Sequence, residues 1–472
     1  MNSYFNREKP KTLKAKGGGV ILLLFVVAIF GLMGQTSVYA QQLYGSITGR
    51  VIDATGATVP GADITVVNEE TNYTQSTISS ETGTYTLLNV PKGDYRMNVA
   101  MPGFKEFVKT GVVVTVGNMT REIVELQVGE ISEQITVSAS ATLLQTDAAD
   151  IHSQVETKEI TDLPMGQFRN YQSLINLVPG ATPARFQNAI TDTPGRSLST
   201  NMNGTARNNN NTRIDGAQSV NVWLPHHAAY VPPAETIEVA NVSTNNFEAE
   251  IGFAGGAAIT VVTKSGTNEF HGSAFVFHEN NRWNARNFFN FLDTDGDGKA
   301  DQPDGKRTIT GATIGGPIVK DKLFFFGGWE GTFQRLARTQ TNTLPTAEMR
   351  EGDFSAFLPG NSDDYPETII YDPFTGDPDG SNKTPFPNNI IPASRLSPAA
   401  LRMQENLPLP NLPGLTQNFE KSGTEVMDRN NFDVKGDWYR TDEHRLWGKY
   451  SWMTARVTKD PMYGKEGGGG AI

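Results

Sequence analysis

The chain alternates short hydrophobic runs with glycine, proline and polar turns, and most of these runs have the length and spacing of β-strands. The clearest example is residues 255–277, GGAAITVVTKSGTNEFHGSAFVF. The run AITVVT is nearly all β-branched, which predicts a strand buried on both faces, whereas aromatic and small or polar residues alternate from Glu269 to Phe277. Period-two alternation with large aromatics is typical of a wall between lipid and a polar interior. A buried strand is therefore followed here by a strand of a different kind.

The first 40 residues have the three parts of an export signal. Basic residues open the chain, an apolar run extends from Val20 to Met33, and Val38-Tyr39-Ala40 precedes Gln41. The apolar run is shorter than the roughly 20 residues that a helix needs to cross a bilayer. We therefore predict a signal peptide over residues 1–40, with cleavage after Ala40.

Composition excludes several classes of protein. The formal net charge of −11 becomes more negative once the basic leader is removed, so no nucleic-acid partner is expected. Cysteine is absent, which excludes a disulfide framework and thiolate chemistry. The chain has 38% hydrophobic residues, 47 glycines, 26 prolines and no second long apolar run, which excludes a helical membrane protein. Only a closed barrel remains as a way to cross a bilayer.

Residues 41–128 follow the pattern of a small antiparallel sandwich of about seven strands. Turn residues at Pro60-Gly61 and Lys92-Gly93-Asp94 separate the runs. The alternation predicts inward-facing side chains at Ile64, Val66, Tyr85, Leu87, Tyr95, Met97 and Val99. The next segment, GEISEQITVSAS from Gly129 to Ser140, is β-prone without proline. It is either the last strand of the sandwich or a peptide that adds as a strand to a partner's edge.

The sequence of residues 143–263 predicts a segment that contains both helical and loop structure. Apolar side chains recur at near-helical spacing until Pro179-Gly180 ends the pattern, at Ile160, Leu163, Phe168, Tyr171, Leu174, Ile175 and Val178. The asparagine run from Asn208 to Asn211 predicts a loop, and Arg213-Ile214-Asp215-Gly216 follows it.

After residue 266 the strand candidates are Glu269 to Glu279, Thr308 to Gly316, Lys322 to Gln334, Asn431 to Tyr439 and His444 to Thr454. The connections between them are alternately long and short: 280–307, 317–321, 335–430 and 440–443. Outer-membrane barrels have short periplasmic turns and long outer loops, so both long connections are predicted outside the cell. Proline is dense in the longest one, which argues against regular strands there.

Several of these segments resemble one family. GGAAITVVTKSGTNEFHGSAF is similar to the plug-to-barrel junction of TonB-dependent outer-membrane receptors. The succession GDFS, YDP-TG, IP-SR and P-PN in the longest connection points to the Oar-like receptors in particular. Residues 41–128 resemble the carboxypeptidase regulatory-like domain, a transthyretin-like sandwich grouped with carbohydrate-binding-like folds.

The resemblance implies a mainly β chain with five parts: a signal peptide (1–40), the sandwich (41–128), a TonB box and linker (129–142), an α+β plug domain (143–266) and the first strands of a transmembrane antiparallel β-barrel (267–472). It implies location in the outer membrane with the N-terminal domain in the periplasm. A full receptor of this type has about 22 strands, so the sequence is expected to cover an incomplete receptor.

The resemblance also implies the function of a transporter, which binds an extracellular ligand and imports it with energy transmitted by TonB. The TonB box corresponds to Glu133, Gln134, Ile135, Thr136 and Val137. Arg207, Arg213 and Asp215 are candidate ligand contacts at the plug apex, although such residues more often hold plug loops against the barrel wall. Oligosaccharide, peptide and metal chelate all remain open as ligands. Aromatic residues at Phe288-Phe289 and Phe324 to Phe326 are predicted to face lipid.

The first outer loop contains DTDGDGKADQPD, whose acidic residues follow the spacing of an EF-hand-like calcium loop. The candidate ligands are Asp293, Asp295, Asp297, Lys299 through its carbonyl, Asp301 and Asp304. The alternative is a solvated acidic turn. Calcium would order the loop, and no cofactor is required.

The sequence shows no zinc pattern among its six histidines, no GxSxG and no nucleotide-binding fingerprint, so an enzyme is not expected. His271 and His278 are interpreted as wall residues of the first barrel strand. The alternative functions are a surface structural or adhesion protein without transport and, less favoured, a secreted hydrolase with an accessory sandwich.

Overall fold

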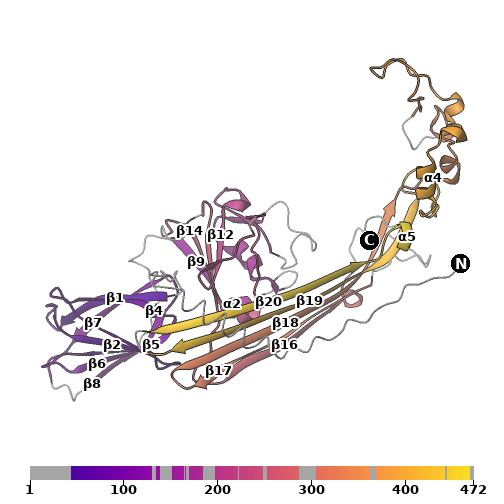
Figure 1. Cartoon of the computed structure of the whole chain (residues 1–472). Helices are drawn as coiled ribbons and strands as arrows, with labels where there is room; N and C mark the ends of the chain where they lie inside the picture. The colour runs from indigo at the N-terminus through magenta and orange to yellow at the C-terminus, as the bar shows by residue number, and fades with distance from the viewer. Residues whose placement is uncertain are drawn as a thin grey trace, which may run out of the picture. The chain divides into compact units, whose positions relative to one another are not determined.

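The computed structural model describes residues 44–129, 134–138, 151–163, 165, 169–183, 197–221, 223–247, 252, 254–285, 304–361, 368–441 and 444–467. These residues are mainly β, as predicted, and their strands form five sheets (Figure 1). The predicted signal peptide lies outside them. Among the described helices, none is long and apolar enough to span a membrane.

The N-terminal unit consists of two sheets that share one hydrophobic core. The first sheet has the order β4-β1-β7 and is built from β1 (Tyr44–Asp53), β4 (Thr84–Pro91) and β7 (Met119–Leu126). The second has the order β3-β2-β5-β6-β8, from β2 (Asp63–Asn68), β3 (Thr74–Ile78), β5 (Gly93–Ala100), β6 (Glu106–Val114) and β8 (Gln134–Ser138). All the predicted inward-facing positions are buried in this core: Ile64, Val66, Tyr85, Leu87, Tyr95, Met97 and Val99.

The pairing within this unit departs from a purely antiparallel sandwich at two places. β1 pairs with β7 in parallel, in addition to its antiparallel partner β4. β8 is an eighth strand and pairs in parallel with β6, with Ile135 opposite Phe107. The interpretation of the 129–140 segment as the last strand of the sandwich is therefore confirmed for Gln134–Ser138.

The central unit is a mixed sheet of order β13-β12-β15-β14-β9. It contains β9 (Ile151–Glu156), β12 (Asn211–Ile214), β13 (Ala217–Gln218), β14 (Ile237–Asn245) and β15 (Ala258–Thr263). β15 lies between parallel β12 and antiparallel β14, and all but one of its residues are buried. The prediction of a strand covered on both faces is confirmed.

The helical pattern before residue 180 is broken into pieces. α2 (Thr157–Asp162) ends at Leu163, whose backbone is extended, as expected for a residue that precedes a proline. A 3-10 helix, η2 (Tyr171–Leu177), follows, and β10 (Ala181–Pro183) pairs with β11 (Thr200–Met202). Of the predicted apolar face, Ile160, Tyr171, Leu174, Ile175 and Val178 are buried in one core, Leu163 is 40% exposed, and Phe168 lies outside the described residues.

The C-terminal part is a five-stranded antiparallel sheet in chain order, β16 (His271–Asn280), β17 (Gly305–Val319), β18 (Leu323–Asn342), β19 (Phe419–Tyr439) and β20 (Arg445–Lys459). All five predicted strands are present, and His271 and His278 lie on the first of them. β18 and β19 continue well beyond the predicted ends, because they remain paired from Leu323–Trp438 to Asn342–Phe419.

The two faces of this sheet have the polarity expected of a membrane wall. One face carries exposed apolar side chains at Val276, Ile314, Val434, Trp438, Tyr450 and Trp452. The other carries buried polar side chains at Glu330, Thr332, Asn431, Asp433, Lys435 and Lys449. A water-soluble sheet would show the opposite distribution. The predicted lipid-facing position is wrong for Phe324 and Phe326, which are buried on the polar side, because they alternate with Phe325 along β18.

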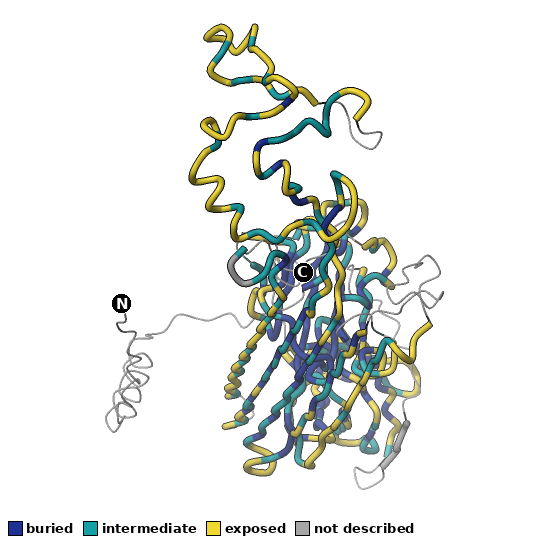
Figure 2. Tube along the Cα trace, turned by 90° about the vertical axis from the view of Figure 1, so that its right-hand side faces the viewer, coloured by how far each residue is buried: buried dark blue, intermediate teal, exposed yellow. Residues whose placement is uncertain are grey.

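The long connection from 343 to 418 is held by side chains instead of sheet pairing. Its described residues contain α3 (Ala347–Arg350), α4 (Pro398–Gln404) and only isolated β-bridges, and most are exposed or half-buried (Figure 2). Asn389 donates to the carbonyls of Phe354 and Thr368, and Arg350 donates to four carbonyls of Pro345, Gln404, Leu407 and Pro408. The absence of regular strands from the described part of this proline-rich segment matches the prediction.

The sequence motifs of this connection contact one another. Gly352 of GDFS has φ +95° and leaves no room for a side chain, since a Cβ would lie 2.5 Å from the Ile391 carbonyl oxygen. Asp372 of YDP forms an ion pair with Arg395 of the IP-SR segment, and the Arg395 guanidinium lies 4.7 Å from the ring centroid of Phe374. The motifs are thus parts of one folded loop.

An arginine on the apolar face of the sheet should destabilise the protein in its membrane. For Val434→Arg we expect a cost of up to about 4 kcal/mol, depending on depth, because the guanidinium must leave water. The measurement is the amount of folded protein in the membrane fraction when the gene is expressed whole. Ile78→Arg is the matched control, because Ile78 is also an exposed β-branched residue on a strand but belongs to the N-terminal unit. Equal yields of the two variants would contradict the assignment of this face to lipid.

Candidate functional site

Asp215 stands at a two-residue turn between β12 and β13. Asp215 and Gly216 have φ values of +47° and +80°, which a turn of this length between antiparallel strands requires. Asp and Gly tolerate this conformation better than most residues. The turn projects the Asp215 side chain beyond the end of β15, where it accepts hydrogen bonds from Thr263 N at 2.9 Å and Thr263 Oγ1 at 2.6 Å.

Two lysines face this turn from the C-terminal sheet. Lys435 on β19 and Lys449 on β20 are direct cross-strand partners. Their side chains are only 8% and 9% exposed. Like charges directly opposite one another on a sheet repel, and burial strengthens the repulsion. The pair therefore needs negative charge close to both ammonium groups.

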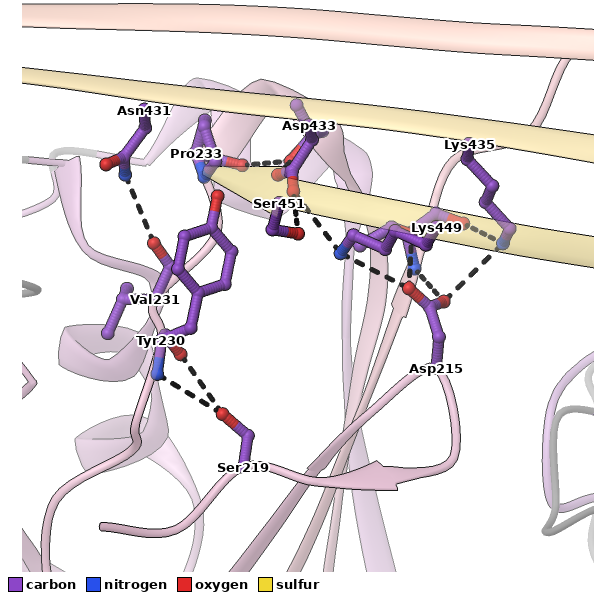
Figure 3. Close-up of polar contacts among 12 residues, drawn as sticks. Asp215, Ser219, Tyr230, Val231, Pro233, Asn431, Asp433, Lys435, Lys449 and Ser451 are labelled. Atoms are coloured by element: carbon purple, nitrogen blue, oxygen red, sulfur yellow. Dashed lines mark hydrogen bonds and ion pairs between the residues drawn. The ribbon is translucent and has the colours of Figure 1, made fainter. Parts of the chain in front are cut away.

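Asp215 supplies that charge and lies between the two ammonium groups (Figure 3). Its Oδ1 is 3.5 Å from Lys435 Nζ, and its Oδ2 is 3.3 Å from Lys449 Nζ. Lys435 also donates to the carbonyl oxygen of Thr263 at 3.1 Å. Burial by itself raises the pKa of Asp215, but the two lysines and the hydrogen bonds from Thr263 outweigh it, so the pKa of this carboxyl lies below its ordinary value.

A second carboxylate completes the cluster from the sheet side. Asp433 Oδ1 lies 3.5 Å from Lys449 Nζ and accepts a hydrogen bond from Ser451, and Asp433 Oδ2 accepts one from Thr236 of the central unit at 3.1 Å. The cluster thus contains two lysines and two aspartates. We call Asp215, Asp433, Lys435 and Lys449 the wall cluster.

A separate contact joins the central unit to the first strand of the sheet. Arg169 forms an ion pair with Glu235 at 2.9 Å, and its guanidinium lies 4.5 Å from the ring centroids of both Phe275 and Phe277 on β16. Ser273 of the same strand donates to Glu235 at 3.4 Å. Arg169 has φ +47°, a conformation that costs free energy in a non-glycine residue. Arg169, like Asp215, thus contacts the sheet from a position with positive φ.

The wall cluster holds two elements together without covalent chemistry. Asp215 pairs with both lysines across the two elements, whereas Asp433 pairs with Lys449 within the sheet. Separating the elements therefore leaves the buried Asp215 carboxylate without its counter-ions unless water enters. In the part of the chain that the structure describes, no three histidine or acidic side chains converge as a metal site would require. The arrangement is a buried polar contact that joins the central unit to the C-terminal sheet.

The predicted ligand-contact residues are not gathered at one place. Asp215 is 2% exposed in the wall cluster, Arg213 lies on β12 opposite Gln218, and Arg207 opens the 3-10 helix η3 (Arg207–Asn209). A hollow beside Arg207 and His226 has a volume of only about 20 Å³, which is room for one water molecule. A ligand role for these residues stays a prediction.

The other sequence-predicted sites are only partly described. Most of the predicted calcium ligands lie outside the described residues: Asp293, Asp295, Asp297, Lys299 and Asp301. Glu133 of the predicted TonB box and the Phe288-Phe289 pair also lie outside them. Asp304 is exposed and forms an ion pair with Arg282 at 3.1 Å. Gln134, Ile135, Thr136 and Val137 form most of β8.

Sequence reasoning missed Lys435, Lys449 and Asp433 as functional residues. Each lies within a predicted strand, and the signal was a charged residue at alternate positions of a strand whose other positions are aromatic or aliphatic. In a membrane wall such positions face the interior, where a charge needs a partner.

Comparisons with known proteins agree with this architecture. Residues 262–471 match the outer membrane beta barrel domain family, and residues 46–127 match the carboxypeptidase regulatory-like domain family. The chain is 28% identical over 336 residues to the TonB-dependent transporter Oar of Myxococcus xanthus. This alignment covers 67% of this chain and 29% of the relative. The chain thus spans less than a third of the length of this curated relative, and the matched barrel domain places it in the outer membrane.

Solved structures similar to this chain include two outer-membrane proteins. The outer membrane transporter YddB from Escherichia coli aligns with 66% of this chain and 34% of its own, at 11% identity and a TM-score of 0.39. A ferric enterobactin receptor mutant from Pseudomonas aeruginosa aligns with 66% of this chain and 35% of its own, at 13% identity and a TM-score of 0.35.

Removing the charge of Asp215 should loosen the central unit from the sheet. Asp215→Asn keeps the side-chain size but leaves Lys435 and Lys449 opposed, and we expect a cost of about 3–5 kcal/mol, the usual penalty for breaking a buried ion pair. The measurement is the free energy of unfolding in detergent together with protease cleavage of the central unit. Asp304→Asn is the control, because it breaks an exposed ion pair. If the two variants lose the same stability, the wall cluster has no special role.

The contribution of Asp215 should also depend on pH in a defined direction. Because its folded pKa is lowered, the stabilisation is complete above the unfolded pKa of about 3.9 and is lost as pH falls through the still lower folded pKa. The difference in unfolding free energy between the natural protein and Asp215→Asn should be constant from about pH 8 to 5 and shrink below about pH 3.9. A difference that already declines near pH 6 would assign the effect to another group.

Proposed function

We propose that this chain, a member of the TonB-dependent outer-membrane receptors, imports an extracellular ligand by displacing its central unit from the barrel wall. The central unit, residues 143–266, acts as the plug, and residues 267–472 form the wall on which it is held. The observation that carries the proposal is the wall cluster, in which Asp215 joins the central unit to two adjacent barrel strands.

The chemistry of the contact fits a plug that must move. Apolar burial would hold the plug equally firmly at every stage, whereas buried ions are held only while they are paired and dry. Water that enters the barrel can solvate Asp215, Lys435 and Lys449 as they separate. Ligand or TonB binding can then displace the central unit if its binding free energy is only moderately more favourable for the displaced state than for the docked state.

Force reaches the plug through the segment on its N-terminal side. TonB in the periplasm would pair with Glu133 to Val137, an edge-adding peptide of the β-augmentation type. The regulatory-like sandwich, residues 41–128, precedes this segment and so lies in the periplasm with it. Residues 1–40 serve as the signal peptide that exports the chain.

The ligand is bound from outside by the outer loops and the plug apex. Arg207 and Arg213 are the candidate contacts, whereas the burial of Asp215 favours a role in plug positioning. The small hollow beside Arg207 means that an oligosaccharide, peptide or metal chelate needs a further surface, for which the folded 343–418 segment is the candidate. Calcium held by Asp293 to Asp304 would order the first outer loop.

A surface structural or adhesion protein is the second candidate. The observation that favours it is the internally bonded outer loop, in which Arg350 and Asn389 hold distant segments together as in a binding module. An adhesin does not need TonB, so engagement of TonB separates the two functions. Neither function involves bond-making chemistry.

Proline in the proposed TonB segment should prevent strand pairing with TonB. Ile135→Pro removes a backbone donor, and we expect at least a tenfold loss of affinity between the detergent-purified receptor and the periplasmic domain of TonB. Ser138→Ala is the control, because it lies just outside the segment and keeps its donor. Biolayer interferometry provides the affinities. Absence of measurable binding by the unaltered receptor would favour the adhesion function instead.

A further inference from the structure

The segment proposed to engage TonB already has a partner within the chain. β8 (Gln134–Ser138) forms the end strand of the β3-β2-β5-β6-β8 sheet. It pairs in parallel with β6 over five successive residues, from Glu106–Gln134 to Thr110–Ser138. Nearly the whole of the proposed TonB box is therefore stored as a strand of the N-terminal unit.

The position of β8 completes the β6 ladder. β6 is paired with β5 on one side and, from Glu106 to Thr110, with β8 on the other. Two further backbone bonds hold the approach to β8, from Lys105 N to Gln127 O at 2.8 Å and from Gly129 N to Gly103 O at 3.2 Å. These bonds hold residues 127 and 129 beside the residues that precede β6.

We propose that the N-terminal unit withholds the coupling segment from TonB, and that β8 must leave β6 before TonB can pair with it and pull. This inference rests on the proposed function, because it assumes that Glu133 to Val137 is the segment that TonB engages. It adds a regulatory role for the carboxypeptidase regulatory-like domain, whose β6 edge acts as an internal competitor for that segment.

The path of a pulling force supports release. Residues 139–150 connect β8 to β9, the first strand of the central unit. While β8 is paired with β6, a pull on it is resisted by the N-terminal unit, because the β6–β8 ladder must shear first. Tension passes through residues 139–150 to the plug only after that ladder has opened.

The pairing has the properties of a reversible one. β8 is short, lies at the edge of its sheet and is bonded in parallel, which is slightly weaker per residue than antiparallel pairing. Short edge strands belong to the parts of a fold that open at low free energy. If only the released fraction binds TonB, the apparent dissociation constant rises by the reciprocal of that fraction.

A disulfide between β6 and β8 tests the proposal directly. Thr110→Cys with Ser138→Cys joins two residues that are opposite one another in the ladder, at the spacing of adjacent strands that a disulfide can bridge. The chain contains no natural cysteine, and both positions lie outside Glu133 to Val137, so the segment itself is unchanged. The control pair is Thr48→Cys with Thr86→Cys, which links β1 and β4 and leaves β8 free.

The measurement is the affinity of the full receptor in detergent for the periplasmic domain of TonB, before and after reduction. We expect the oxidised Thr110/Ser138 variant to bind at least tenfold more weakly, reduction to restore binding, and the control pair to bind normally in both states. Unchanged binding by the oxidised variant would overturn the inference, since TonB would then add to the open edge of β8 in place. Failure of every reduced form to bind would instead contradict the proposed function.

Hydrogen exchange on the unaltered receptor gives a second readout that needs no substitution. Release of β8 uncovers the β6 edge from Glu106 to Thr110, so exchange of the β6 amides that face β8 in this stretch should accelerate at least several-fold when the TonB domain is added. Addition of TonB to β8 in place would leave β6 exchange unchanged and would overturn the inference even if the cysteine variants did not fold.

Discussion

The structure depends on two lysines that face each other across neighbouring strands and cannot remain buried together unaided. Lys435 and Lys449 are cross-strand partners on the polar face of the C-terminal sheet, and Asp215 of the central unit lies between their ammonium groups. Without the central unit both lysines would lose Asp215, and Asp433 would remain as the sheet's own partner of Lys449. Without the sheet the buried Asp215 carboxylate would lack its counter-ions. The wall and the central unit therefore define each other's position through charge.

The sheet can hold such charges because its polarity is reversed relative to a soluble protein. Strand alternation places Trp438, Tyr450 and Trp452 on one face and the charged side chains of Asp433, Lys435 and Lys449 on the other. A lipid environment favours the first face, while the enclosed face tolerates ions. The same alternation brings Phe324 and Phe326 to the enclosed face, where Phe324 packs 5.5 Å from Tyr439. Alternation decides which side a residue occupies, and its hydrophobicity alone does not.

Much of this architecture was accessible from the sequence because it follows from local patterns. Alternation predicted all five strands of the C-terminal sheet and the inward positions of the N-terminal unit, and Asp215-Gly216 was recognised as part of a family segment. The wall cluster was not accessible, because it requires knowing that the turn after β12 meets β19 and β20, and Asp215 and Lys449 are far apart in the chain. The parallel pairing of β8 with β6 was missed for the same reason. The segment has strand propensity, but propensity does not determine which strand it pairs with.

The two candidate sites lie on one continuous path along the chain and resist separation in different ways. β8 is held by backbone hydrogen bonds that can break one after another, whereas the wall cluster is held by four charges that depend on one another. The ladder of a short edge strand can open in a local fluctuation, whereas the charges of the cluster lose their mutual support once water replaces one partner. Under the proposed function, a weak ladder placed before a charge cluster would allow the β8 segment to be released while the central unit remains on the sheet.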